Sequence, residues 1–500
     1  MSNKKLLFKG SLLRTIVLAA NILTGFFLMP FLINSLGNEQ YGLWILASTI
    51  VGFYGLLDVG LGGACTRFIV RSIHDPDPDS VNYAISTGVF LFLLLSGITV
   101  ILTFILYFTG EFFVSEKELI SIYSTLIFLL GIKSAISFPL VTFHGVLMAK
   151  ERFDYISYVQ LIMIVCRVSF IYYFISNGHN VITLAYIVII TDILSNILIM
   201  LTAIKIHPTI RVGLRFFSFK KLKSYYNWGK YTYLSVIAQR LNHSTDDVVI
   251  ASIVGVGAVT HYTIATTLIN YFNELIVSAF GVILPKLNKY HKLKQFKEIR
   301  QTIFNALDLS SQLSLFIGGM FIIMGQAFLN IWVGTEFTDS YYALVILSIP
   351  VIFSNMQTTT SSALFATAQH QTYTKVILLS AIINLSLSVL LCYKFGLIGA
   401  AFGTAVPMLL FYIVFLPVHA CKKLEIKLSQ YYIFIIKRVI FSILFFVITY
   451  WIINPIVINN YFTLILGSAI ITILYFILAY LLILTPVTKS HIQQTLNRTR

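Results

Sequence analysis

Apolar runs long enough to cross a lipid bilayer recur along the whole chain. A membrane-spanning helix needs about 20 mostly apolar residues, because it rises about 1.5 Å per residue through a hydrocarbon core about 30 Å thick. With 58% hydrophobic and only 11% charged residues, the chain lies outside the range of soluble domains. The sequence therefore predicts an all-α polytopic membrane protein with about 14 transmembrane helices. The expected spans lie near 12–34, 41–68, 82–108, 119–148, 155–176, 180–204, 226–253, 258–284, 301–329, 339–368, 372–393, 397–419, 433–453 and 461–485.

The formal net charge of +16 is divided among short basic clusters between the apolar runs, so nucleic acid is not expected as a partner. Lys and Arg collect in every second connection, whereas the opposite connections hold only Lys117 and Lys394. Because Lys and Arg concentrate in cytoplasmic loops of membrane proteins, the basic connections are predicted to be cytoplasmic. An even number of crossings then places both termini on the cytoplasmic side.

An internal repeat appears at an offset of 218 residues. Segment 35–47 aligns with 253–265 and matches Gly37 with Gly255, and each segment follows an odd-numbered helix. Since this offset equals six predicted helices, it indicates a parallel repeat of two six-helix lobes. The predicted domains are an N-terminal lobe at 1–204, a basic cytoplasmic linker at 205–225, a C-terminal lobe at 226–420, and two extra helices with a cytoplasmic tail at 421–500.

The predicted seventh helix, 226–253, carries an unusual polar face. At about 100° per residue, Arg240, His243, Asp246 and Asp247 fall on one side of it. A charge at the centre of a bilayer costs about 2.5–3.5 kcal/mol on insertion scales, so this face is expected to line a shared polar cavity. Arg240 is expected close to the membrane midplane.

Other charged residues lie inside apolar runs: Lys133, Arg167, Asp192, Glu274 and Asp58. Several have polar neighbours at helical spacing, such as Ser137 after Lys133, and Ser195 and Asn196 after Asp192. Ser, Thr and Asn commonly hold transmembrane helices together, and a purely structural ion pair stays open for the charged residues. The tenth helix is polar nearly all round at 354–362, which predicts local irregularity.

Catalytic residues, metals and cofactors are not expected from the residue pattern. The four cysteines have no C-x-x-C spacing, and His144, His243 and His261 lack partners at metal-ligand spacing. The chain also lacks the G-x-x-x-x-G-K-[ST] loop that binds nucleotide phosphates.

Four segments resemble a known family. They are "SLGNEQYGLW" at 35–44, residues 57–62 followed by Arg67, "HGVLMAKERFDY" at 144–155, and "DDVVIASIVG" at 246–255 followed by Tyr262. They are similar to the polysaccharide-transporter branch (Wzx-type O-antigen flippases) of the MOP exporter superfamily.

The resemblance implies a flippase in the inner (cytoplasmic) membrane. Its substrate would be an undecaprenyl-diphosphate-linked oligosaccharide of O-antigen, lipopolysaccharide or a related surface polysaccharide, moved by alternating access. Implied partners are membrane lipid, H⁺ or Na⁺ as counter-ion, and the polymerase and chain-length regulator of the same pathway. A cation-lined lumen would be formed by Lys133, Arg167 and Arg240, and the coupling groups or counter-ions would come from Asp58, Asp192, Asp246, Asp247 and Glu274.

Two other functions stay open. A cation-coupled drug antiporter of the related multidrug-exporter branch would favour an acidic cavity and twelve helices, so the mid-span cations and the two extra helices count against it. A membrane glycosyltransferase, polymerase or ligase would need a sizeable outer loop or soluble domain, and the predicted outer connections are too short for one.

Overall fold

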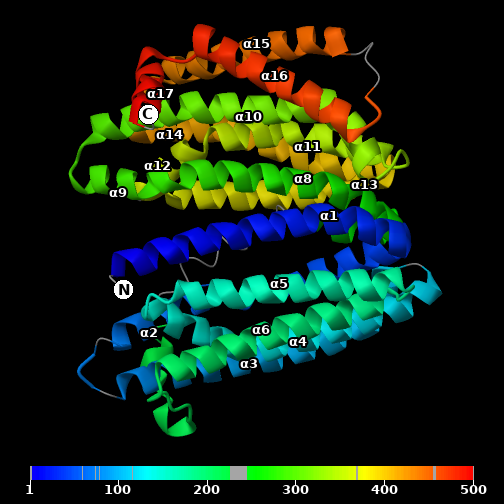
Figure 1. Ribbon diagram of the computed structural model, residues 1–500, viewed down its shortest axis with the longest axis vertical. Coiled ribbons are helices and arrows are strands. Elements are labelled where there is room, and N and C mark those ends of the chain that lie inside the picture. Colours follow the sequence, from blue (N-terminus) through cyan, green and yellow to red (C-terminus); the bar gives the residue numbers. More distant parts are fainter. Residues whose placement is uncertain are drawn as a thin grey trace. The chain divides into compact units, whose positions relative to one another are not determined.

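The computed structural model describes residues 3–58, 60–73, 75–77, 79–114, 116–223, 225, 245–367, 370–453 and 458–498 (Figure 1). The regular structure in these ranges is helical, and they contain no strand. The chain forms two compact units, Met1–Thr260 and His261–Arg500, which are described separately.

The first unit contains six main helices among its described residues before 226. Helices α3, α4 and α6 run side by side in Figure 1, and α1 packs along α5. An apolar core that includes Phe92 and Tyr225 lies between α2, α3, α4 and α6. The helices are α1 (Asn3–Gly52), α2 (Leu61–Ile73), α3 (Ser80–Phe108), α4 (Lys117–Ala149), α5 (Phe153–Ser176) and α6 (Val181–Ile206), with short 3-10 turns η1 (Phe53–Leu56), η2 (Gly110–Phe112) and η3 (Leu214–Phe216). Helix α8 (Val256–Phe280) begins in this unit and continues into the second.

The basic segment 205–225 docks on α3 through hydrogen bonds. The backbone N–H of Arg211 donates to Asn82 Oδ1 at 2.8 Å, and the hydroxyl of Tyr225 donates to the carbonyl of Ala84 at 3.0 Å. This segment is therefore a packed part of the first unit.

The second unit places α15 and α16 against α10, with Tyr475 inside an aromatic cluster that includes Phe316 and Phe446. The two C-terminal spans thus pack on α10 within this unit. The helices of this unit are α9 (Leu284–Lys292), α10 (Phe296–Trp332), α11 (Thr338–Met356), α12 (Thr358–Ala366), α13 (His370–Leu410), α14 (Leu416–Leu424), α15 (Leu428–Ile453), α16 (Tyr461–Leu482) and α17 (Pro486–Arg498), with the 3-10 turn η4 (Gly281–Ile283) and the π-helix η5 (Phe411–Phe415).

Eleven helices in the described ranges are long and apolar enough to span a membrane. Two of them contain a kink, at Gly37 and at Gly396, so each of these counts as two spans and the described total becomes thirteen. The remaining predicted span, 226–253, lies mostly outside the described residues, and its end at 245–253 is helical. The predicted all-α membrane fold is confirmed.

The repeat recurs in the backbone geometry. Gly37 and Gly255 both have positive φ, at 80° and 122°, and Gly178 and Gly396 form a second such pair, at 82° and 57°. Both pairs are separated by 218 residues. Residues with a Cβ rarely adopt positive φ, so the same turns need glycine in both halves. The division between the two units follows Thr260 in the chain. Residues 226–244 lie outside the described residues, and the domain limits predicted at 204, 225 and 420 stay predictions.

The predicted irregularity of the tenth helix is confirmed. Helix α11 ends at Met356, and Gln357 leaves helical geometry (φ −100°, ψ 14°) before α12 begins. The Ser310 hydroxyl donates to the Met356 carbonyl at 2.7 Å, and Gln357 Nε2 donates to the Tyr412 carbonyl at 2.7 Å. Neighbouring helices thus hydrogen-bond to groups at the break.

Candidate functional site

A charged trio joins three helices of the first unit: Lys133 of α4, Arg167 of α5 and Asp192 of α6. Lys133 Nζ lies 2.6 Å from Asp192 Oδ2, and the Arg167 guanidinium bonds the other carboxylate oxygen. Arg167 Nε also donates to Thr191 Oγ1 at 2.9 Å. Lys133 is the central residue of the 33-residue α4, so the trio lies far from the helix ends.

The trio carries an excess of positive charge, because two cations share one carboxylate. Lysine has three N–H donors and arginine has five, more than the two oxygens of Asp192 can satisfy. The three side chains are 24–30% exposed. A charged group at mid-membrane is costly against acyl chains, so the exposed portions of these side chains are expected to face water. This arrangement can bind an anion.

A polar triad lies next to the trio on two of its three helices. Ser137 and His144 belong to α4, and Asn196 belongs to α6. His144 Nε2 lies 3.2 Å from Asn196 Oδ1, and Asn196 Nδ2 lies 3.5 Å from Ser137 Oγ. All three side chains are half-buried. The sequence placed Ser137 and Asn196 beside the charges, but it gave no sign that His144 would join them.

Two acidic residues of the predicted set lie at the end of the seventh span. Asp247 Oδ2 accepts a hydrogen bond from Thr49 Oγ1 of α1 at 2.8 Å, and Asp246 is buried, with 5% of its surface exposed. The predicted lumen cation Arg240 and its neighbour His243 lie outside the described residues. Their roles stay predictions.

Asp58 and Glu274 have different surroundings. The Asp58 carboxylate accepts a hydrogen bond from the backbone N–H of Gly62 at 2.8 Å and so caps the beginning of α2. Glu274 is exposed on α8. Neither lies in the charged trio, and their proposed part in coupling stays a prediction.

Sequence reasoning missed a second charged network, in the other unit. Asp308 of α10 and Arg438 of α15 form an ion pair with side chains 0% and 4% exposed. Thr485 donates twice to Asp308 Oδ2, from its backbone at 2.9 Å and its hydroxyl at 2.8 Å. Arg438 also donates to the Phe434 carbonyl at 2.7 Å and lies over the Phe434 ring. The sequence feature that could have indicated this pair is an Asp and an Arg placed inside two separate apolar runs.

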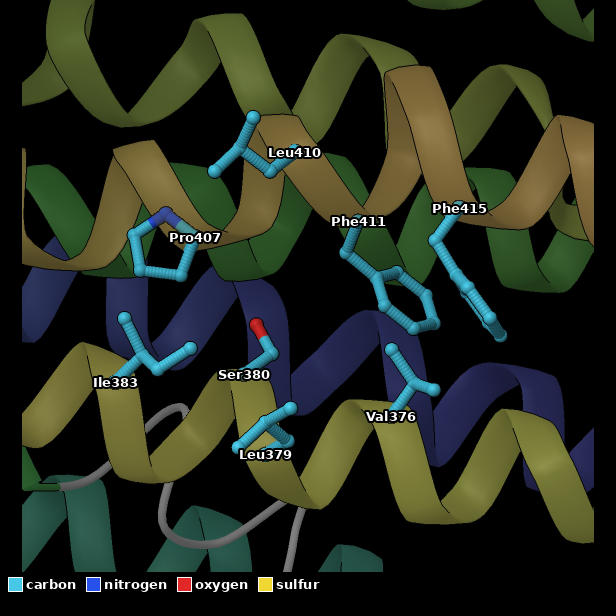
Figure 2. Close-up of a pocket in the computed structure, with 8 residues that line it drawn as sticks. All are labelled: Val376, Leu379, Ser380, Ile383, Pro407, Leu410, Phe411 and Phe415. Carbon is cyan, nitrogen blue, oxygen red and sulfur yellow. The ribbon is translucent and has the colours of Figure 1, made fainter.

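An apolar pocket of about 150 Å³ lies between the two halves of α13 and η5 (Figure 2). Ser380 supplies its polar side chain. The lining residues are Val376, Leu379, Ser380, Ile383, Pro407, Leu410, Phe411 and Phe415. Because it carries no charged side chain, this pocket is unsuited to a phosphate group, and the charged trio is the better candidate site.

Comparison with known proteins points to one group of membrane proteins. Residues 7–291 match the family described as polysaccharide biosynthesis protein. The chain is 23% identical over 393 residues to a putative O-antigen transporter of Shigella flexneri, covering 76% of this chain and 90% of that protein. It is also 27% identical over 193 residues to a probable low-salt glycan biosynthesis flippase of Haloferax volcanii, covering 38% of this chain and 40% of the relative.

Solved structures share the fold. The lipid II flippase MurJ, in an inward closed conformation, superposes with a TM-score of 0.73 at 14% identity, covering 93% of this chain and 98% of that chain. An inward-facing multidrug resistance transporter of the MATE family and MOP superfamily gives a TM-score of 0.69 at 15% identity, covering 82% of this chain and 95% of that chain. At such low identity the likeness concerns the fold alone.

Proposed function

This chain belongs to the polysaccharide biosynthesis protein family, and we propose that it is a flippase for undecaprenyl-diphosphate-linked oligosaccharide repeat units. The product would be O-antigen or a related surface polysaccharide. The substrate would cross the inner membrane by alternating access, with both termini of the protein in the cytoplasm. The names of the two relatives, an O-antigen transporter and a glycan flippase, support this proposal.

The observation that carries the proposal is the net positive charge of the charged trio, in which two cations share one carboxylate. A lipid-linked diphosphate must pass the membrane midplane, and the loss of its hydration is the main barrier. Fixed cationic donors can replace that water, and arginine binds phosphate oxygens in a bidentate manner. Partly exposed cations at mid-helix therefore suit a diphosphate better than they suit a cationic drug.

Each member of the trio has a proposed role. Arg167 binds the diphosphate with its planar donors, and Lys133 adds a compact charge beside it. Asp192 holds both cations while the site is empty and competes with the substrate for them, which allows release. Arg240 is proposed as a third cation of the same path.

The remaining features of the transport cycle are proposed more broadly. H⁺ or Na⁺ is the proposed counter-ion, and Asp192, Asp246, Asp247, Glu274 and Asp58 are the carboxylates available to couple its movement. Membrane lipid, and the polymerase and chain-length regulator of the same pathway, are the proposed partners.

Reconstitution in proteoliposomes tests the proposal. The probe is undecaprenyl-diphosphate-N-acetylglucosamine, and its leaflet is followed by its accessibility to an added glycosyltransferase. We expect the wild-type protein to change the leaflet of the probe and leave its bonds intact, and Lys133→Gln/Arg167→Gln to abolish the movement. A change in bond chemistry would indicate an enzyme, and no movement by the wild type would contradict the flippase function.

A cation-coupled drug antiporter is the second candidate, because a multidrug transporter shares the fold. The net positive charge of the trio opposes this function. Efflux of ethidium driven by an imposed H⁺ or Na⁺ gradient, in the same proteoliposomes, would favour it.

A further inference from the structure

We infer that the polar triad, Ser137, His144 and Asn196, is the subsite that binds the first sugar attached to the diphosphate. The inference rests on the proposed flippase function and adds a residue set that selects the glycan. The charged trio would hold the phosphates, and the triad would hold the neighbouring ring.

The spacing of the two sets supports this division. Ser137 follows Lys133 by four residues on α4, and Asn196 follows Asp192 by four residues on α6. Four residues amount to about 6 Å along a helix. On both α4 and α6, therefore, a neutral polar side chain follows a charged one at the same distance along the same face. A diphosphate joined to a pyranose changes from anion to neutral hydroxyls over a similar distance.

The residue types match a sugar. An amide, an imidazole and a hydroxyl together offer several donors and acceptors without a fixed negative charge. Sugar hydroxyls and N-acetyl groups need both donors and acceptors. A second phosphate would instead favour further cations, as in the trio.

Interhelical support is the competing explanation for these three residues, and the hydrogen-bond lengths count against it. The triad distances of 3.2 and 3.5 Å lie at and beyond the long end of the usual N–H···O range of about 2.7–3.2 Å. By contrast, a buried polar network in the second unit joins Ser442, Tyr475 and Gln312 through O–H···O bonds of 2.7 and 3.0 Å, within the range of about 2.5–3.0 Å that is usual for hydroxyl donors. Long bonds between half-buried groups can be exchanged for bonds to a ligand at small cost.

Binding measurements with matched probes test the subsite. The probes are undecaprenyl diphosphate, its N-acetylglucosamine derivative and its galactose derivative, with undecaprenol as the neutral reference. Affinities are measured in detergent for the wild type, for Asn196→Ala, and for Lys133→Gln/Arg167→Gln. The control variant is Ser195→Ala, which removes the hydroxyl of the neighbouring polar residue on α6.

We expect the wild type to bind at least one sugar-bearing probe more tightly than bare undecaprenyl diphosphate. Asn196→Ala should lower the affinity for that probe by about three- to tenfold, which is the effect of one or two lost hydrogen bonds. Its affinity for bare undecaprenyl diphosphate should be unchanged. Lys133→Gln/Arg167→Gln should lower the affinity for every diphosphate probe, and Ser195→Ala should leave every affinity unchanged. Unchanged binding of the bare diphosphate also shows that Asn196→Ala is folded.

Two outcomes overturn the subsite. In the first, the wild type binds sugar-bearing and bare diphosphate probes equally well. In the second, Asn196→Ala lowers the affinity for all diphosphate probes equally, or for none of them. Failure of the flippase function has a different signature, in which the wild type binds no diphosphate probe better than undecaprenol. That last result would remove both proposals together.

Discussion

Two charged networks in the described membrane-spanning helices differ in balance and burial. Asp308 and Arg438 pair one to one, with 0% and 4% of their side chains exposed. Lys133 and Arg167 share the single carboxylate of Asp192, and all three are about a quarter exposed. A balanced and buried pair is suited to holding helices together, whereas an unbalanced and accessible group keeps binding capacity for an external anion.

The internal repeat extends the contrast. The residues 218 positions after Lys133, Arg167 and Asp192 are Val351, Leu385 and Leu410. The positive-φ glycines recur at this offset, but the charged trio does not. The repeat therefore preserves the turns that shape the fold, and the charged trio belongs to one half.

The largest effect is expected from breaking the buried pair. Arg438→Ala leaves the Asp308 carboxylate buried without its cation, which should cost about 3–5 kcal/mol of stability. Thermal unfolding in detergent and the yield of monodisperse protein would measure this loss. The double variant Asp308→Leu/Arg438→Met should recover most of it, and wild-type stability of the single variant would contradict the structural role.

Removal of Arg167 should have the opposite profile. Arg167→Ala should weaken undecaprenyl diphosphate binding by about 10–100-fold, because a charge-assisted hydrogen bond contributes about 1.5–3 kcal/mol. Its unfolding temperature should change much less than that of Arg438→Ala. Arg167→Lys should bind with intermediate affinity. If Arg167→Ala loses stability but keeps its affinity for undecaprenyl diphosphate, the trio holds helices together and does not bind substrate.

Arg240 offers a third cation for the same comparison. Arg240→Ala should severely impair polymer export, Arg240→Lys should be partly active, and both proteins should insert at normal levels because the predicted role is substrate contact. Export is measured by surface polysaccharide in a deletion strain. Recovery of export in Arg240→Ala/Asp247→Ala would indicate a packing ion pair instead.

Asp192→Asn should shift the charge balance of the trio without removing a cation. Because the two cations lose their competing carboxylate, affinity for undecaprenyl diphosphate should rise by a few-fold, while transport slows at the release step. Binding and proteoliposome transport would be measured on the same preparation. Lower affinity with unchanged transport would rule out competition by Asp192.

Of the two predicted losses of stability, the smaller is expected at Asp58. Loss of its cap to α2 in Asp58→Ala should cost about 0.5–2 kcal/mol of stability, and Asp58→Asn should retain most of the cap. Transport by Asp58→Asn should keep its dependence on the ion gradient. Loss of that dependence in a stable Asp58→Asn protein would make Asp58 a coupling residue and not only a cap.

Residues within the predicted site differed in how far the sequence could assign them. Lys133, Arg167 and Asp192 stood out individually, because a charge inside an apolar run is costly wherever it lies. Their contacts could not be assigned, since Lys133 and Asp192 are 59 positions apart on separate helices. Asp58 appeared similar to them in sequence, yet its carboxylate serves the helix that begins three residues later.

The sequence by itself determined the helical spans, their repeat and the breaks within them. These features are local: bilayer thickness sets the length of an apolar run, and glycine permits the positive φ at Gly37 and Gly255. Only the tertiary structure decided which charges are paired. Helical periodicity assigns a residue to a face, but the neighbour across that face depends on packing, as with Arg438 and Asp308, 130 positions apart.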